Sequence, residues 1–185
     1  MVQNKIEGII LAGGKSSRMG KNKAILPYKG KRLIEQIINN LQPICSKVHV
    51  VTSKRNHHEF NFLPHEMMTT DTYDDKGPIS GIHAGLKKIS SNYGFLMACD
   101  MPCFSPQLFD HLKKYVQGHD AVLCPGQPFH GFYHKRIIST LETCILNNEL
   151  KLLNLLDRIN VYYLKPENED CFMNVNTPED YQNLN

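Results

Sequence analysis

Short apolar runs alternate with amphipathic stretches along the chain, a pattern typical of strands that alternate with helices. The run Ile6–Leu11 is apolar, rich in β-branched residues and ends in Gly13–Gly14, which predicts a buried strand. Runs of the same kind predict the other strands: Val48–Thr52, Met67–Thr70, Tyr93–Cys99, Ala121–Cys124, Phe129–Tyr133, Val161–Leu164 and Cys171–Val175.

Helical periodicity fills the stretches between these runs. Apolar residues from Leu33 to Leu41 follow the spacing of one helix face, and Pro43 ends that helix. Similar stripes predict the remaining helices: one after Gly77–Pro78, one opened by Ser105–Pro106, one through Ile137–Ile145, a short one at Leu152–Leu156 and one beginning at Thr177–Pro178. This alternation predicts a three-layer, Rossmann-like α/β fold with a mostly parallel central sheet, in a single domain over residues 1–185.

Composition narrows the class of protein without naming an activity. Of 185 residues, 41% are apolar and 21% charged, which favours an ordered globular domain. No apolar run approaches the ~20 residues of a membrane helix, and the segment Met1–Gly14 lacks the pattern of a signal peptide. We therefore expect a cytoplasmic protein with no membrane partner. The 6 cysteines form no C-x-x-C pair, which favours reduced thiols over a disulfide or zinc framework.

Positive charge is concentrated at the start of the chain. The net charge is +3, but residues 1–35 alone carry eight Lys or Arg against two Glu. Beside glycines, such a cluster suggests a small polyanion such as a nucleotide phosphate chain, and it is too local for a nucleic-acid surface. On charge alone, a solvated basic loop is the preferred interpretation.

Residues 11–23, which we call the glycine–basic loop, follow the first predicted strand. Gly13 and Gly14 permit a tight turn whose backbone N–H groups can bind an anion, and Arg18 and Lys23 can offset phosphate charge. The loop is not a P-loop, because Ile9 stands where G-x-x-x-x-G-K-[ST] requires glycine. Asp100 follows another predicted strand. In parallel sheets ligands bind at the carboxyl ends of strands, so the loop and Asp100 should share one site.

Four segments together resemble the molybdenum cofactor guanylyltransferases, the MobA family, which have a nucleotidyltransferase fold. They are L-A-G-G-x-S-x-R-M-G from Leu11, G-P-I-S-G from Gly77, C-D-M-P from Cys99 and N-V-N-T-P-E from Asn174. The resemblance spans residues 6–182. One departure is Asn22, where the family usually has Asp before the lysine; it implies a modest retuning of the loop.

The resemblance implies a reaction and a set of nucleotide-binding residues. A terminal phosphate of molybdopterin attacks the α-phosphorus of GTP, and pyrophosphate leaves. Arg18 and Lys23 are expected at the β- and γ-phosphates and Asp100 at a Mg²⁺ ion, with a simple strand-end cap as the alternative for Asp100. Asp71 either accepts hydrogen bonds from guanine or is an ordinary polar loop residue. The full nucleotide set is Leu11, Ala12, Gly13, Gly14, Arg18, Lys23, Ser53, Asp71, Gly81 and Asp100.

On the pterin side of the site, the resemblance implies four further residues. His130 and Tyr133 either contact the pterin or pack in the core. Asn174 and Asn176 either contact the pterin phosphate or Mg²⁺, or serve as turn residues before a helix cap. The expected partners are GTP and molybdopterin or molybdenum cofactor, with a cofactor-handover protein as a further candidate and a monomer or weak oligomer as the assembly. The alternatives are a transferase that uses CTP or a sugar-phosphate acceptor, and a nucleotide-binding module without turnover.

Overall fold

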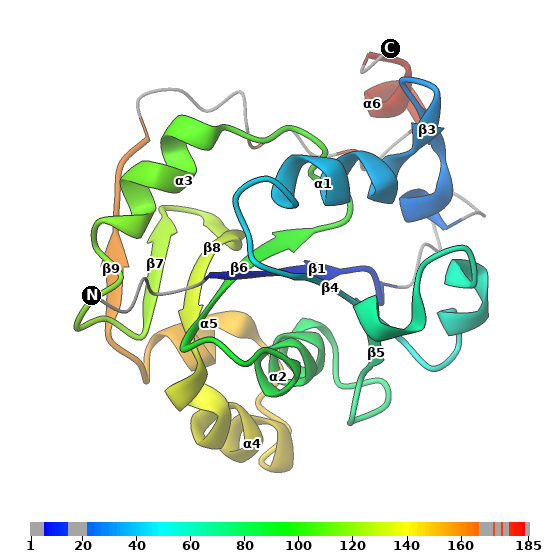
Figure 1. Cartoon of the computed structure of the whole chain (residues 1–185). Coiled ribbons are helices and arrows are strands. Elements are labelled where there is room, and N and C mark those ends of the chain that lie inside the picture. The colour runs from blue at the N-terminus through cyan, green and yellow to red at the C-terminus, as the bar shows by residue number, and fades with distance from the viewer. Residues whose placement is uncertain (1–5, 15–21, 167–171, 173–174, 176–177, 184–185) are drawn as a thin grey trace.

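The computed structural model describes all of the chain except residues 1–5, 15–21, 167–171, 173–174, 176–177 and 184–185. Its centre is a seven-stranded sheet with the strand order β5-β4-β1-β6-β8-β7-β9 (Figure 1). The strands are β1 Glu7–Leu11, β4 Val48–Thr52, β5 Met68–Thr70, β6 Tyr93–Ala98, β7 Ala121–Cys124, β8 Gln127–His134 and β9 Val161–Tyr163. Two short strands, β2 Pro27–Tyr28 and β3 Lys31–Arg32, form a separate hairpin.

The sheet is mostly parallel, as predicted. Strands β5, β4, β1 and β6 pair in parallel, and β9 pairs in parallel with β7. Only β8, among the described strands of this sheet, runs against its neighbours. From β1 the chain first builds outward through β4 to β5 and then returns to place β6 on the other side. This reversal makes the carboxyl end of β1 the switch point of the sheet, where ligands bind in such folds.

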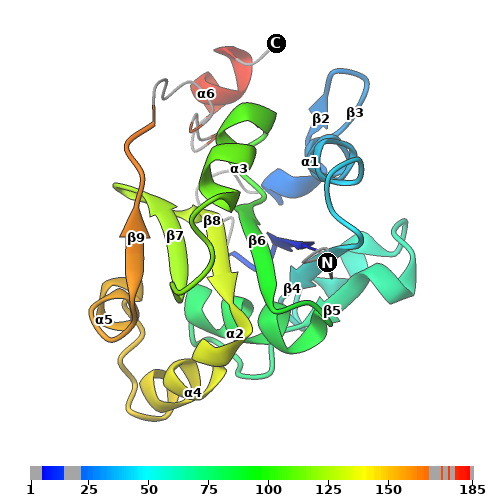
Figure 2. The ribbon, with the colours of Figure 1, turned by 60° about the vertical axis from the view of Figure 1, so that its left-hand side comes forward.

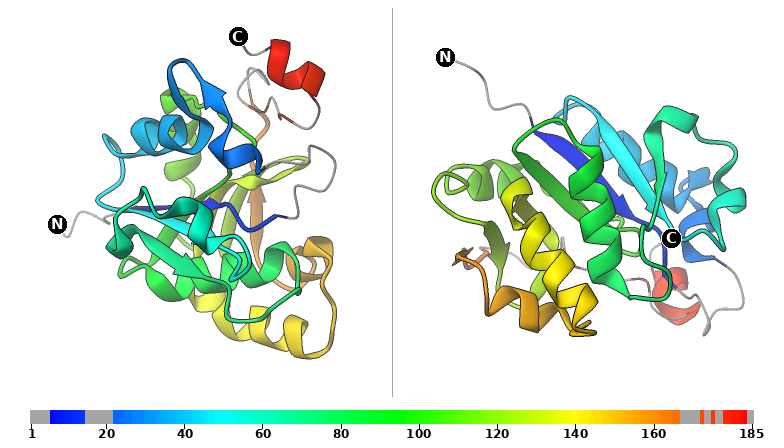
Figure 3. Two further views of the ribbon diagram at one scale, coloured as in Figure 1. Left: turned by 90° about the vertical axis from the view of Figure 1, so that its right-hand side faces the viewer. Right: turned by 90° about the horizontal axis from the view of Figure 1, so that it is seen from below.

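Helices cover both faces and complete the three predicted layers (Figures 1 and 2). Helices α1 Leu33–Leu41 and α3 Pro106–Lys113 lie on one face. The opposite face carries α2 Pro78–Lys88, α4 Ile138–Leu146 and α5 Leu152–Leu156. The 3₁₀ helices are η1 Lys23–Ile25, η2 His57–Phe60, η3 His65–Met67 and η4 Lys135–Ile137. Helix α6 Pro178–Asn183 lies beside the β2–β3 hairpin (Figure 3), where the Tyr181 hydroxyl donates to the carbonyl of Pro27.

The apolar run of β1 is continuous because both of its faces are buried. Ile10 packs in the core under α1 and α3, and Ile9 packs in the core under α2. Helix α2 approaches β1 closely, since a Cβ on Gly85 would lie 2.5 Å from Cγ2 of Ile9. Gly85 is therefore a packing residue that sets the height of α2 above the sheet.

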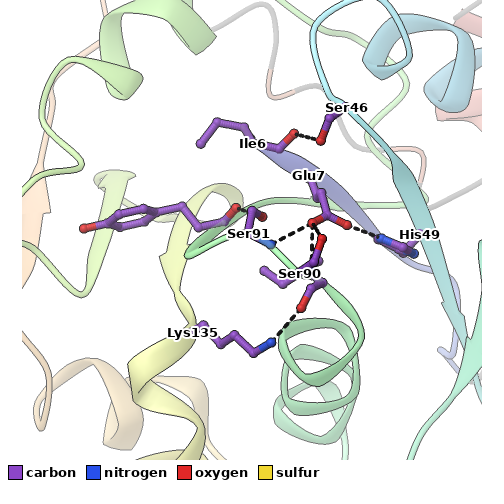
Figure 4. A network of polar contacts seen from close by, with 9 residues as sticks. Ile6, Glu7, Ser46, His49, Ser90, Ser91 and Lys135 are labelled. Atoms are coloured by element: carbon purple, nitrogen blue, oxygen red, sulfur yellow. Dashed lines mark hydrogen bonds and ion pairs between the residues drawn. The ribbon is translucent and has the colours of Figure 1, made fainter. Parts of the chain in front are cut away.

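A polar network ties three segments together at the amino end of β1 (Figure 4). The buried carboxylate of Glu7 accepts hydrogen bonds from His49 Nε2 at 2.7 Å, from Ser90 N at 2.8 Å and from Ser91 N at 2.7 Å. These bonds lower the pKa of Glu7 to about 2, although burial by itself acts in the opposite direction. The network joins β4 and the α2–β6 loop to β1 at the end of the strand that is remote from the switch point.

The predicted strand Cys171–Val175 is wrong for the two of its residues that the structure describes. Phe172 and Val175 are buried but belong to no strand. The N–H of Val175 instead donates to the carbonyl of Asp100 at 2.8 Å, so Val175 lies against the loop that follows β6. Helix α6 follows as predicted, while its expected cap, Thr177, lies outside the described residues.

Among the cysteines of the described residues, Cys45, Cys99 and Cys144 are free thiols, and Cys171 lies outside the described residues. Among the described residues, no helix is both long and apolar enough to span a bilayer.

Candidate active site

A cleft of about 1420 Å³ opens at the carboxyl edge of the parallel strands. The mutually parallel strands β1, β4, β5 and β6 each bring residues to it: Leu11 at the end of β1 and Gly13 beyond it, Ser53 after β4, Asp71 after β5, and Cys99 and Asp100 after β6. The amino end of α2 adds Gly77, Pro78 and Gly81, and the β7–β8 turn with the start of β8 adds residues 126–129. The site thus lies at the carboxyl ends of the strands, where the sequence places it.

Two glycines that line this cleft lie close to neighbouring segments. A Cβ on Gly13 would lie 3.2 Å from the backbone nitrogen of Ser53 and 3.6 Å from Oδ2 of Asp71. A Cβ on Gly81 would lie 3.1 Å from Leu11 and 3.5 Å from Oδ1 of Asp71. Both glycines therefore permit a close approach at the end of β1, Gly13 to Ser53 and Gly81 to Leu11, and both lie next to Asp71.

Asp71 presents a carboxylate that is half-buried and incompletely satisfied. Its backbone N–H is held by the carbonyl of Thr52, but its buried Oδ1 has no hydrogen-bond partner among the described residues. Burial, and to a smaller extent the charge of Asp74, raises the pKa of Asp71 to about 6. An unpartnered acceptor on the floor of a cleft is suited to a ligand that brings N–H donors.

Asp100 is placed where β6 ends, and Lys23 lies close enough to act on it electrostatically. Burial raises the pKa of Asp100, and the positive charge of Lys23 offsets only part of this effect. The side chain of Asp100 is half-buried. A carboxylate in this position gains from a further cation, which fits a divalent metal bound together with phosphate oxygens. Among the described residues, no group of three or more acidic, His or Cys side chains forms a metal cluster.

Two residues that the sequence predicts as possible contacts of the pterin substrate lie in the core of the structure. His130 and Tyr133 are both 0% exposed and do not line the cleft. The ring of His130 packs among Phe95, Phe104 and Phe172, and the hydroxyl of Tyr133 donates to the carbonyl of Pro128 at 2.6 Å. Burial lowers the pKa of His130 to about 4 and raises that of Tyr133. Core packing, the alternative that the sequence left open, is therefore their role in this conformation.

The remaining predicted residues divide into three groups. Leu11, Gly13, Gly14, Ser53 and Gly81 line the cleft with the two aspartates. Ala12 is buried beneath it and contributes its backbone carbonyl to a hydrogen bond with Asn56. Arg18, Asn174 and Asn176 lie outside the described residues.

Sequence reasoning missed one wall of the cleft. Lys54 pairs with Asp74 at 3.0 Å and Arg55 with Asp75 at 3.6 Å, and these exposed pairs join the segment after β4 to the segment after β5. Asn56 and Glu59 line the same wall. A signal was available, because Lys54, Arg55, Asn56 and Glu59 closely follow the end of the predicted strand Val48–Thr52.

A glycine turn, a lysine and two half-buried aspartates at the switch point of a parallel sheet define a nucleotide-binding α/β protein. The family described as the MobA-like NTP transferase domain matches residues 8–160. The chain belongs to this family.

Similar proteins carry consistent names. The chain is 31% identical over 180 residues to the molybdenum cofactor guanylyltransferase of Vibrio vulnificus, covering 93% of this chain and 91% of that protein. It is 32% identical over 186 residues to the probable molybdenum cofactor guanylyltransferase of Carboxydothermus hydrogenoformans, covering 95% and 92%. The crystal structure of molybdopterin-guanine dinucleotide biosynthesis protein A from Archaeoglobus fulgidus superposes with a TM-score of 0.82 at 29% identity, covering 96% of each chain.

Proposed function

We propose that this chain transfers GMP from GTP to the terminal phosphate of molybdopterin or molybdenum cofactor and releases pyrophosphate. The observation that carries the proposal is the placement of Asp71 and Asp100 in one cleft with the Gly13 turn. The names of relatives that match almost the whole chain support the choice of substrates.

Asp71 supplies the preference for guanine. The Watson–Crick edge of guanine offers two neighbouring donors, N1–H and the 2-amino group, and an ionised carboxylate offers two acceptors. Oδ1 of Asp71 has no other partner among the described residues, so it can accept one of these bonds without losing another. Adenine and cytosine lack this pair of donors, which leaves the half-buried carboxylate less well satisfied.

The glycine–basic loop holds the triphosphate. Gly13 and Gly14 line the cleft at the switch point, and their backbone N–H groups suit an anion. Lys23, and Arg18 as the sequence predicts, neutralise the β- and γ-phosphates. The reaction brings two anions together and places charge on the leaving pyrophosphate, so these cations act by positioning and by charge stabilisation.

Asp100 would hold Mg²⁺ against the phosphates. A bound Mg²⁺ would neutralise charge on the α-phosphate and on the leaving pyrophosphate. The acceptor phosphate oxygen then forms a bond to the α-phosphorus while the bond from that phosphorus to the pyrophosphate oxygen breaks. The protein itself needs no covalent nucleophile for this exchange, only alignment of the two phosphates.

The contacts proposed for the acceptor substrate, the pterin, come from the sequence resemblance. Asn174 and Asn176 stay predicted contacts for the pterin phosphate, and Val175 between them bonds to the backbone of Asp100. A cytoplasmic location, a monomeric or weakly associated state and a cofactor-handover partner also stay predictions.

A thermal-shift panel of GTP, CTP, ATP and UTP, each with magnesium, tests the nucleotide. At about 100 times its dissociation constant, GTP should add about 2.7 kcal/mol to the free energy of unfolding, and the others should add less. Pyrophosphate release from GTP that depends on added molybdopterin then tests transfer. Equal stabilisation by CTP and GTP contradicts the guanylyl assignment, and GTP binding without release favours a module that has lost turnover.

A further inference from the structure

Two side chains from the segment after β4 reach the two described ends of the glycine–basic loop. Asn56 Nδ2 donates to the carbonyl of Ala12 at 3.0 Å. Glu59 Oε2 accepts from Nδ2 of Asn22 at 2.5 Å. Asn56 and Glu59, which we call the loop clamp, are 44 and 37 residues distant in sequence from the groups that they bind.

The loop clamp lies on and next to η2, a short helix that is anchored at both ends. Phe60, which ends η2, is fully buried in the core. At the other end of η2, Nδ1 of His57 lies 2.7 Å from Oγ1 of the buried Thr52, the last residue of β4. Both ends of this short helix are thus anchored, and the loop clamp extends from a fixed element toward the loop.

The orientation of the Asn56 amide is set by its neighbour. Ser53 Oγ donates to Oδ1 of Asn56 at 2.8 Å, which directs the Nδ2 donor toward Ala12. Because a Cβ on Gly13 would lie 3.2 Å from Ser53 N, the glycine turn rests directly on this segment. Ser53 and Asn56 together therefore fix the height of the Gly13 backbone above the sheet.

Asn22 has two separate tasks at the far end of the loop. Its Oδ1 accepts from Ala24 N at 3.1 Å and caps η1, the helix that begins with Lys23. Its Nδ2 donates to Glu59. An aspartate could perform the first task but not the second, because two carboxylates at this distance repel each other. The departure from the family pattern at Asn22 is thus matched to the carboxylate of Glu59.

From these contacts we infer that Asn56 and Glu59 are positioning residues, which hold the Gly13 turn and Lys23 in register for the triphosphate of the nucleotide. The inference rests on the proposed function, since it assigns a role within the same nucleotide site. It also explains Asn22, the departure from the family pattern, as one half of a pair with Glu59.

The experiment exchanges the hydrogen-bond donor and acceptor between Asn22 and Glu59. Asn22→Asp keeps the cap of η1, removes the bond to Glu59 and places two carboxylates against each other, so it should weaken GTP binding about tenfold or more, the scale of one lost hydrogen bond to a charged group. The double variant Asn22→Asp with Glu59→Gln restores the bond in the opposite direction, and its GTP affinity should return to within about twofold of the wild type.

The other residue of the loop clamp is tested by Asn56→Ala, which should raise the KM for GTP more than it lowers kcat. Glu66→Gln and Asn61→Ala, at exposed positions outside the cleft, are the matched controls.

Binding is measured by calorimetry with GTP and magnesium, turnover by pyrophosphate release, and folding by Tm. Recovery of GTP affinity in the double variant, at an unchanged Tm, supports the inference. Wild-type affinity in Asn22→Asp and in Asn56→Ala overturns it, as does a defect of Asn22→Asp that the second change leaves in place. A wild-type protein that binds no GTP overturns the proposed function itself, which separates the two failures.

Discussion

Asp71 lies against Gly13 at the floor of the cleft, its Oδ2 atom 3.6 Å from the position that a Cβ on Gly13 would occupy. This contact brings the end of β5 to the end of β1 across the intervening strand β4. Burial of this carboxylate, and to a smaller extent the charge of Asp74, raises its pKa to about 6. The proposed base-recognition group thus lies next to the same turn that is proposed to bind phosphate.

The raised pKa of Asp71 predicts that GTP binding depends on pH. The ionised carboxylate accepts two hydrogen bonds, so GTP affinity should rise between pH 5 and pH 7 with a midpoint of about 6. An amide at this position would present one acceptor and one donor, so Asp71→Asn should bind GTP about 10- to 100-fold more weakly and lose the pH dependence. Calorimetric titrations across this range, with and without the substitution, provide the check.

Asp71→Asn should make the ligand-free protein more stable, although it weakens the binding of GTP. A folded-state pKa above the unfolded value means that the free energy of unfolding falls as pH rises through about 6. Asp71→Asn should therefore raise the Tm at neutral pH while it weakens GTP binding. A lowered Tm would identify Asp71 as a structural residue instead.

Asp100→Asn should separate turnover from folding. The amide keeps the shape of the side chain, and the bond from Val175 goes to the backbone carbonyl, so it survives. Pyrophosphate release should fall by ~10² or more, the scale of one lost preorganised electrostatic contact. Because burial raises the pKa of Asp100, removal of its charge should leave the Tm at neutral pH unchanged or higher. Near-normal release at matched circular dichroism would place the metal elsewhere.

His130→Phe tests whether this histidine contacts substrate or only fills the core. Neither ring nitrogen has a hydrogen-bond partner among the described residues, and three aromatic rings surround it. Replacement by an apolar ring should thus stabilise the protein by about 1–2 kcal/mol. The KM for the pterin substrate should stay unchanged; a rise of tenfold or more would return His130 to the acceptor site.

The pH dependence of the free energy of unfolding provides a second test of the burial of His130. Its pKa is lowered to about 4, so below pH 6.5 the unfolded chain takes up a proton that the folded chain refuses. Wild type should lose about 2 kcal/mol more stability than His130→Phe between pH 7.5 and pH 5. Urea unfolding of both proteins at the two pH values measures this difference.

Much of the fold could be predicted because its strands are buried on both faces. Ile9 and Ile10 enter separate cores, so the run containing them is apolar throughout and ends sharply at the glycines. The position of the site followed from the same pattern, since residues at strand ends meet at one edge. The strand expected at Cys171–Val175 failed because Phe172 and Val175 are buried by packing and by the loop after β6, which gives the same apolar composition without a strand partner.

Contacts between distant segments were beyond the reach of the sequence. Nothing local to Asn56 or Glu59 indicates that they bind residues 44 and 37 positions earlier. The role of His130 was equally hidden, because alternation along a strand shows which face a residue takes and not which rings surround it. In each case the partner is fixed by sheet order, which only the folded chain reveals.

Glu7→Gln should reduce stability and leave catalysis alone. The carboxylate of Glu7 is buried at the amino end of β1 and accepts bonds from His49, Ser90 and Ser91, so an amide in its place loses charge-assisted bonds and directs an N–H₂ group at donors. The free energy of unfolding should fall by about 2–3 kcal/mol at pH 7. Because the folded-state pKa of Glu7 is lowered from 4.5 to about 2, the difference in stability between wild type and variant should be complete above pH 4.5 and shrink as pH falls toward 2.

Urea unfolding at pH 7, 4 and 3 measures this difference in stability, with Glu66→Gln as the exposed control. At a temperature where both proteins are folded, kcat/KM for GTP should match the wild type, since the network and the cleft lie at opposite ends of β1; an equal loss of stability at every pH would mean that shape, and not charge, holds this end of the sheet.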